Sequence, residues 1–217
     1  MAYKSPEEVK QQHLEAMGST LGPLYHALYI DVMLLHATWQ QNLKLFGEQT
    51  RVDVLNSVAG FFFWTIQRVF GRDVLLGLAR LVDPPTSLKR ADWANLTLQA
   101  LPVAIPDSTL ALKTRARVEE ARTRCDFAVQ WRNLNIAHHD LDVALDSPIA
   151  RRLPDARRVD VEAALTSVRK TLEPIHSHYL HGMDPGFERF DGGADADALL
   201  YYLRHERSAD GETGARE

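Results

Sequence analysis

The stretch from Arg132 to Asp140 brings a fixed cation, amides, two imidazoles and a carboxylate close together in the chain. It reads Arg132-Asn133-Leu134-Asn135-Ile136-Ala137-His138-His139-Asp140. An arginine stays charged and presents a planar fork of N–H donors that suits a phosphate. A histidine gives or takes a proton near neutral pH. These residue types together favour a site that holds a phosphodiester and moves its protons.

The spacing within this stretch limits which side chains can meet. In an ideal α-helix Arg132 and His139 share a face, whereas His138 lies roughly 120° around the axis. Either histidine could therefore approach a phosphate held by Arg132, depending on where the helix ends. The alternative is that both histidines only interact with the carbonyl groups and the dipole of the helix end.

Helical periodicity dominates the chain, and no segment shows the sustained alternation of a strand, so the sequence predicts an all-α helical bundle. Helices are expected over about 5–17, 20–46, 51–82, 92–101, 107–137 and 160–181, with a small docking helix over 195–207 and a loop over 84–90. Ser5 and either Asp107 or Ser108 are the expected N-caps. Gly47 is the expected C-terminal cap of the second helix, and a break is expected near Gly60.

The expected domain organisation is one bundle with an appendage. Residues 1–182 are expected to form the helical bundle, with long antiparallel helices. Residues 183–207 are expected to form a connector and the docking helix, and residues 208–217 a disordered polar tail.

Composition excludes several classes of protein. The 217 residues carry a formal net charge of −4, so any site for a polyanion must be a local patch. A single cysteine, Cys125, rules out an intrachain disulfide and a cysteine-based metal cage. The N-terminus lacks the pattern of a signal peptide, and the apolar run from Val58 to Trp64 is too short to span a bilayer. We therefore expect a cytoplasmic protein without a membrane partner, and with no resident metal or cofactor.

The motif also carries a family resemblance. Arg132-Asn133 followed by Ala137-His138, with the spacing Arg-x5-His, resembles the Arg-x(4–6)-His signature of the HEPN superfamily. Members of this superfamily are small helical proteins and in many cases metal-independent ribonucleases. The surrounding stretch 131–142 resembles the AbiU-type abortive-infection branch, and so do the segments 51–56 and 73–84. The resemblance covers roughly residues 20–205.

The resemblance implies roles for individual residues. Arg132 would hold the scissile phosphate, His138 would act as general acid or base, and Asn133 would orient the site, with His139 and Asp140 as secondary candidates. It also implies a homodimer that assembles the site from two copies of the motif, RNA as the substrate, and an antitoxin or a defence partner.

Two basic clusters flank the motif. The downstream cluster is less balanced by acids and is the candidate RNA-binding surface; it consists of Arg151, Arg152, Arg157 and Arg158. The upstream cluster is expected to be a solvated helix face whose arginines pair with Glu119 and Glu120.

Three further patterns each allow two interpretations. The aromatic run 61–64 is expected to be buried on most sides or to lie in a dimer interface, with base stacking as the alternative. The histidines at 176, 178 and 181 are expected to be solvated at a helix end rather than to bind a metal. Asp73, Arg80 and Asp83 form either a polar network that supports Arg132 or an ordinary surface stripe.

Two functions remain in view after these observations. One is a metal-independent endoribonuclease of a prokaryotic defence or toxin-like system. The other is a non-catalytic HEPN-like module that binds RNA, a nucleotide or a protein partner.

Overall fold

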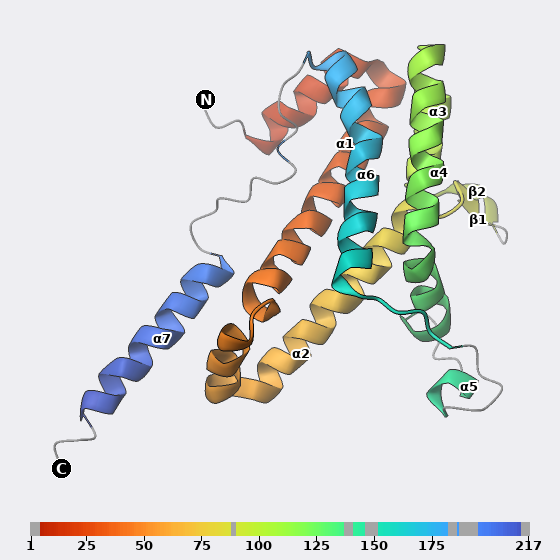
Figure 1. Cartoon of the computed structure of the whole chain (residues 1–217). Coiled ribbons are helices and arrows are strands. Elements are labelled where there is room, and N and C mark those ends of the chain that lie inside the picture. Colours follow the sequence, from red (N-terminus) through yellow and green to blue (C-terminus); the bar gives the residue numbers. More distant parts are fainter. Residues whose placement is uncertain are drawn as a thin grey trace. The chain divides into compact units, whose positions relative to one another are not determined.

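A computed structural model describes residues 5–87, 90–136, 141–145, 152–181, 186 and 195–213 of the chain (Figure 1). The elements follow in the order α1 (Pro6–Phe46), α2 (Gln49–Leu81), β1 (Thr86–Ser87), β2 (Arg90–Ala94), η1 (Leu98–Ala100), α3 (Leu101–Ala104), α4 (Ser108–Trp131), η2 (Arg132–Ile136), α5 (Leu141–Ala144), α6 (Arg158–Tyr179) and α7 (Ala196–Thr213). The predicted helical fold class is confirmed, with one small hairpin as the exception.

Helix α1 begins where the sequence predicts. The backbone N–H of Glu8 donates to Oγ of Ser5 at 3.3 Å, and the N–H of Ser5 donates to the Glu8 carboxylate at 2.7 Å. This reciprocal pair is a capping box that satisfies two backbone donors at the helix start. Gly18 has a φ of 76°, so α1 consists of two helical segments that meet at this glycine, as the two expected helices imply.

Helix α2 is also interrupted near the expected position. The departure from helical geometry lies at Ala59, with φ −155° and ψ 64°, one residue before the glycine that the sequence singled out. Between α1 and α2, the N–H of Gly47 donates to the carbonyl of Leu43 at 2.8 Å. A Cβ at Gly47 would lie 2.4 Å from that carbonyl oxygen, so only glycine fits there without a backbone shift.

The segment after α2 differs from the sequence prediction. The loop expected over 84–90 and the helix expected over 92–101 are replaced by the antiparallel hairpin of β1 and β2, followed by η1 and α3. Asn95 explains the difference, because its backbone N–H donates to the carbonyl of Pro85 at 2.8 Å and its side chain to that of Pro84 at 2.9 Å. These hydrogen bonds reverse the direction of the chain. They also engage residues that the helix expected over 92–101 would need.

The chain forms two compact units, each described here by itself. Unit 1 consists of Met1–Leu35 and Leu75–Phe187. Its core includes a seam where α4 packs on α6 (Figure 1). The buried positions of the two helices recur every three or four residues, as an amphipathic helix requires; they include Val118, Ala121, Cys125 and Ala128 on α4 and Val161, Leu165, Val168 and Leu172 on α6.

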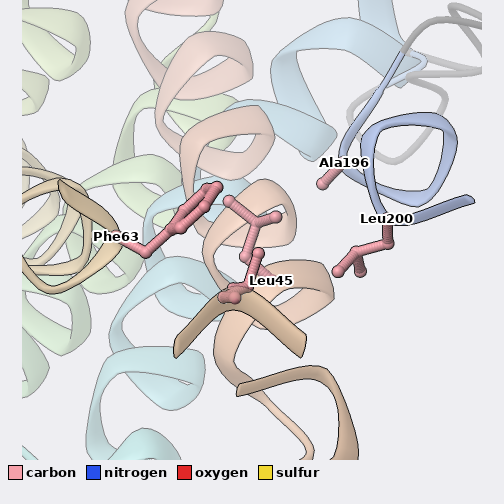
Figure 2. Packing of buried hydrophobic residues seen from close by; sticks show 5 residues of the cluster. Leu45, Phe63, Ala196 and Leu200 are labelled. Carbon is pink, nitrogen blue, oxygen red and sulfur yellow. The ribbon is translucent and has the colours of Figure 1, made fainter. Parts of the chain in front are cut away.

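Unit 2 consists of His36–Val74 and Glu188–Glu217. Figure 2 shows its core, in which Phe63 of α2, Leu45 of α1 and Leu200 of α7 converge with Leu55 and Ala196. Polar contacts fix the start of α7. Arg51 donates to Asp197 at 3.0 Å and to the carbonyl of Lys44 at 2.7 Å, and Lys44 pairs with Asp195. Pairing with Asp195 and Asp197 raises the pKa of Lys44.

Each unit consists of two segments that are separated in the sequence. The expected boundary at 182/183 lies near the point where the chain leaves unit 1, but unit 2 also takes residues 36–74 from the middle of the chain. Helix α7 extends to Thr213, beyond the expected end at residue 207 and into the segment expected to be disordered. A linear pattern of composition does not reveal such a unit, because its two segments are distant in sequence.

Candidate functional site

The candidate motif begins where the α-helical geometry of α4 changes to π-helical geometry. Helix α4 starts with Asp107 as N-cap, whose carboxylate accepts from the N–H of Leu110 at 2.6 Å, and it ends at Trp131. Residues Arg132–Ile136 then form the wider π-helical turn η2. Such turns are rare and often occur at functional sites. Trp131 holds this end of the helix, because its indole Nε1–H donates to the carbonyl of Pro154 at 2.8 Å.

Arg132 has two acidic or polar partners. Its Nη1 lies 2.5 Å from both carboxylate oxygens of Asp83, and its Nε donates to Oδ1 of Asn133 at 3.1 Å. The side chains of Arg132 and Asp83 are 20% and 23% exposed, so the pair is mostly shielded from water. The guanidinium is therefore held in one orientation.

Asp83 is itself held by a network that the sequence does not reveal. The hydroxyl of Thr97 donates to the carbonyls of Leu81 at 2.9 Å and of Asp83 at 2.7 Å. The side-chain amide of Gln99 donates to the carbonyls of Val82 at 2.7 Å and of Asp83 at 2.9 Å. These bonds satisfy the carbonyl groups left open at the end of α2. They also fix the backbone of Asp83, the residue whose carboxylate contacts Arg132.

The sequence left open whether Asp73, Arg80 and Asp83 form a polar network with Arg132 or a surface stripe. Asp83 contacts Arg132, whereas Arg80 pairs with Asp31 at 3.8 Å on an exposed surface. Asp73 is exposed and belongs to unit 2. One of the three residues therefore supports the site.

The other motif residues fall into two groups. Asn133 is exposed and accepts a hydrogen bond from Arg132. His138, His139 and Asp140 lie outside the described residues. Over Arg132–Ile136 the backbone is π-helical, so the ideal α-helical spacing does not describe this part of the motif.

The candidate RNA-binding arginines are less free than their sequence context suggests. Arg151 lies outside the described residues, and Arg152 is exposed. Arg157 donates to Asp160 at 2.8 Å, which raises the pKa of Arg157 and lowers that of Asp160. Arg158 donates to Glu162 at 2.8 Å. Two of the four arginines are therefore paired with acids of the first turns of α6.

The upstream arginines pair along their own helix, as predicted. Arg117 donates to Glu120 at 2.8 Å and Arg122 to Glu119 at 2.9 Å, all on the exposed face of α4. A groove of about 590 Å³ lies between α4 and α6 near Trp131. Its lining includes more carboxylates than cations, namely Glu120, Asp126, Asp155 and Asp160 against Arg124 and Arg157.

A second polar cluster in unit 1 was not predicted as a cluster. Nδ1 of His13 lies 3.1 Å from Nδ1 of His26, and the hydroxyl of Tyr25 lies 3.0 Å from Nδ1 of His176. His176 is therefore a buried residue rather than a solvated one, whereas His178 is exposed. Among the described residues, no group of three or more His, Cys, Asp or Glu side chains is arranged to hold a metal ion.

No described helix is both long and apolar enough to cross a membrane.

Comparisons with known proteins identify the family. No curated protein and no solved structure matches the chain. The model of the family HEPN_AbiU2, described as AbiU2, matches residues 18–201, which include most of each unit and the stretch at Arg132. The chain belongs to the AbiU2 family of the HEPN superfamily and is an abortive-infection-related HEPN module.

Proposed function

We propose that the chain is a metal-independent endoribonuclease of a prokaryotic defence or toxin-like system. The observation that supports this most is the fixed orientation of Arg132, which Asp83 and Asn133 hold at the start of the family motif. A guanidinium that is oriented before the substrate arrives stabilises developing charge without reorganisation during the reaction. The widened turn η2 places this side chain at a local irregularity typical of functional sites.

The proposed reaction needs only groups that the motif contains. The ribose 2′-hydroxyl of RNA attacks the adjacent phosphate, the 5′-oxygen leaves, and the products are a 2′,3′-cyclic phosphate and a free 5′-hydroxyl. Nε and Nη1 of Arg132 are used by protein partners, so Nη2 is the group proposed to bind the phosphate. His138 is proposed to transfer the protons as general acid or base. His139 and Asp140 are secondary candidates for these roles.

The proposal includes a homodimer and an RNA-binding surface. Two copies of the motif would complete one site, as in the family resemblance. Arg151, Arg152, Arg157 and Arg158 are proposed to follow the RNA backbone next to it. The side chains of Arg157 and Arg158 are exposed, and ion pairs in contact with water contribute little to stability, so a phosphate can replace the carboxylate. A cytoplasmic location and an antitoxin or defence partner are part of the same proposal.

One observation favours a second candidate function, a non-catalytic module that binds RNA, a nucleotide or a protein partner. Asp83 already occupies the guanidinium of Arg132, and this pair connects the end of α2 to the end of α4. The groove beside Trp131 is rich in carboxylates, and the chain as a whole carries a net charge of −4. In this alternative, Arg132 and Asp83 act as a structural clamp.

Cleavage of labelled single-stranded RNA in the presence of a chelator tests the first proposal. We expect the wild-type chain to produce fragments that end in a 2′,3′-cyclic phosphate. Arg132→Ala and His138→Ala are each expected to reduce the rate by about 100-fold or more, since one charge-stabilising or proton-transferring group is lost. Arg117→Ala, an exposed and locally paired arginine of α4, is the matched control. Equal cleavage by wild type and both variants would indicate a contaminating nuclease.

Two further variants separate catalysis from structure. His139→Ala is expected to retain activity. An inactive His139→Ala variant together with an active His138→Ala variant would assign the proton transfer to His139 instead of His138. Asp83→Asn keeps the guanidinium but removes its ionic partner. The nuclease proposal predicts that Asp83→Asn retains more activity than Arg132→Ala, although both lower the melting temperature. Equal loss of thermal stability in both, with no cleavage by any folded chain, would support the structural clamp.

A further inference from the structure

Helix α2 carries an exposed aromatic surface in unit 2. Of the four consecutive aromatic residues, only Phe63 enters the core, with 7% of its surface exposed. Phe61, Phe62 and Trp64 are 81%, 57% and 49% exposed. The sequence favoured either burial of this run or a place in a dimer interface. Within the single chain and its described residues, three of the four rings are in contact with solvent. Exposed aromatic surface of this extent usually marks a binding site.

The exposed rings form an ordered arrangement. The rings of Phe61 and Trp64 are stacked, with centroids 5.7 Å apart and planes inclined by 24°. The guanidinium carbon of Arg68 lies 4.8 Å from the centroid of the Trp64 ring, which is a cation–π contact. Phe62 packs edge-on against the buried Phe63 at 5.3 Å. We call Phe61, Phe62, Trp64 and Arg68 the aromatic face.

The packing explains why this arrangement persists. Phe61, Trp64 and Arg68 follow one another at three- and four-residue spacing, so they lie along one side of α2. Figure 2 shows Phe63 pointing from α2 towards Leu45 in the core of unit 2. The buried ring therefore anchors the helix, and the rings beside it are displayed on a fixed backbone. A rigid aromatic surface loses little side-chain entropy when it binds a ligand.

The segment of α2 that carries the aromatic face has a positive net charge. Between Asp53 and Asp73 the sequence contains no acidic residue, whereas Arg68 and Arg72 are both present and exposed. This local excess contrasts with the net charge of −4 for the whole chain. Stacked aromatic rings next to arginines are the combination that binds unpaired bases and the phosphates between them.

The same charges oppose self-association through this surface. In a two-fold symmetric dimer a patch faces its own copy. Such a contact would bring the arginines of two aromatic faces together, and the segment offers no carboxylate to pair with them. Like charges facing each other across an interface are unfavourable. A negatively charged partner with flat rings matches the surface better than a second copy of the chain.

We propose that the aromatic face binds single-stranded RNA, with bases stacked on Phe61 and Trp64 and phosphates contacted by Arg68 and Arg72. The choice of RNA as the strand rests on the proposed function, whereas the stacking itself does not. The aromatic face belongs to unit 2 and Arg132 to unit 1, so binding and cleavage can be lost separately.

Binding is tested by fluorescence anisotropy with the full-length chain and a labelled, 2′-O-methylated RNA of about 12 nucleotides, a length in the range of single-stranded binding sites. The 2′-O-methyl groups block attack by the 2′-hydroxyl, so binding is measured whether or not the chain cuts RNA. Phe61→Ala and Trp64→Ala are each expected to weaken binding by about 5- to 100-fold, the loss of one stacked base. The matched control is Val103→Ala, an 84% exposed apolar residue of α3, which should change the affinity by less than about twofold.

A conservative variant gives a second readout. Bases stacked on an indole quench its fluorescence, so RNA should quench the tryptophan emission of the wild-type chain. Trp64→Phe is expected to retain the affinity and lose most of this quenching. Loss of binding in Phe61→Ala with cleavage abolished only in Arg132→Ala would support both proposals. RNA binding that is normal in Arg132→Ala, with no cleavage by any chain, would support this site and contradict the nuclease.

Three results would overturn the proposal. The first is unchanged affinity in both alanine variants. The second is equally tight binding of a double-stranded RNA, whose paired bases cannot stack on the protein. The third is a change from dimer to monomer in Phe61→Ala, measured by sedimentation, with the affinity for RNA unchanged, because the aromatic face would then be a subunit interface.

Discussion

Replacing His13 with glutamine is expected to remove much of the acid sensitivity of unit 1. The His13 side chain is 2% exposed and lies among aromatic rings, with the ring centroids of Tyr25 and Tyr29 at 5.1 Å and 5.0 Å. Its Nδ1 shares a hydrogen bond with Nδ1 of His26 at 3.1 Å. That bond needs one donor and one acceptor, so protonation of both rings would break it.

The magnitude follows from the pKa of His13. Burial, followed by the nearby His26 and His176, lowers this pKa from the usual 6.5 to about 4. The unfolded chain therefore takes up a proton near pH 6.5, whereas the folded chain does so only near pH 4. The neutral His13 ring stabilises the fold fully above pH 6.5, and this contribution is lost as the pH falls from 6.5 to about 4. The difference corresponds to about 3 kcal/mol of unfolding free energy.

Urea denaturation followed by circular dichroism measures this effect between neutral pH and about pH 4. The unfolding free energy of the wild type should fall more steeply with acid than that of His13→Gln, with a difference that approaches about 3 kcal/mol. His178→Gln, at an exposed position late in α6, is the control and should follow the wild type. Parallel curves for the wild type and His13→Gln would refute the reasoning, as would a direct imidazole titration by NMR that places the pKa of His13 near 6.5.

Two other stability predictions follow from single contacts. Asp107→Ala removes the N-cap of α4 and should lower the unfolding free energy by about 1 kcal/mol in thermal or urea denaturation, whereas Asp107→Asn, which keeps an acceptor, should cost less. Leu55→Ala opens a cavity in the core of unit 2, where the leucine is 1% exposed, and should cost about 2–5 kcal/mol. A cost below about 1 kcal/mol for Leu55→Ala would mean that this small core is not closely packed.

Local rules predicted the fold where a local interaction determines it. Ser5 and Asp107 begin helices because their side chains bond to backbone N–H groups three residues ahead. Gly18 separates two helical segments because it has a positive φ. The hairpin after α2 was missed because Asn95 contacts the carbonyls of Pro84 and Pro85, ten or more positions away, and no periodic pattern records such a bond.

The same distinction applies to the candidate site. The presence of Arg132 and the supporting role of Asp83 could be proposed from residue types and family segments. The bonds of Thr97 and Gln99 to the end of α2 could not, since a side chain that binds a distant carbonyl leaves no spacing rule in the sequence. The π-helical turn at Arg132 was also missed, because the prediction assumed regular α-helical geometry.

The discontinuous make-up of unit 2 has a consequence for truncated forms of the chain. Unit 2 is an internal insertion completed by the C-terminal segment, so no single cut yields both units intact. A chain that ends before α7 would keep Leu45, Leu55 and Phe63 but lose Leu200, which covers them. Proteolysis between α6 and α7 would thus expose the apolar side chains of this core to solvent, and the shortened chain would be prone to aggregate.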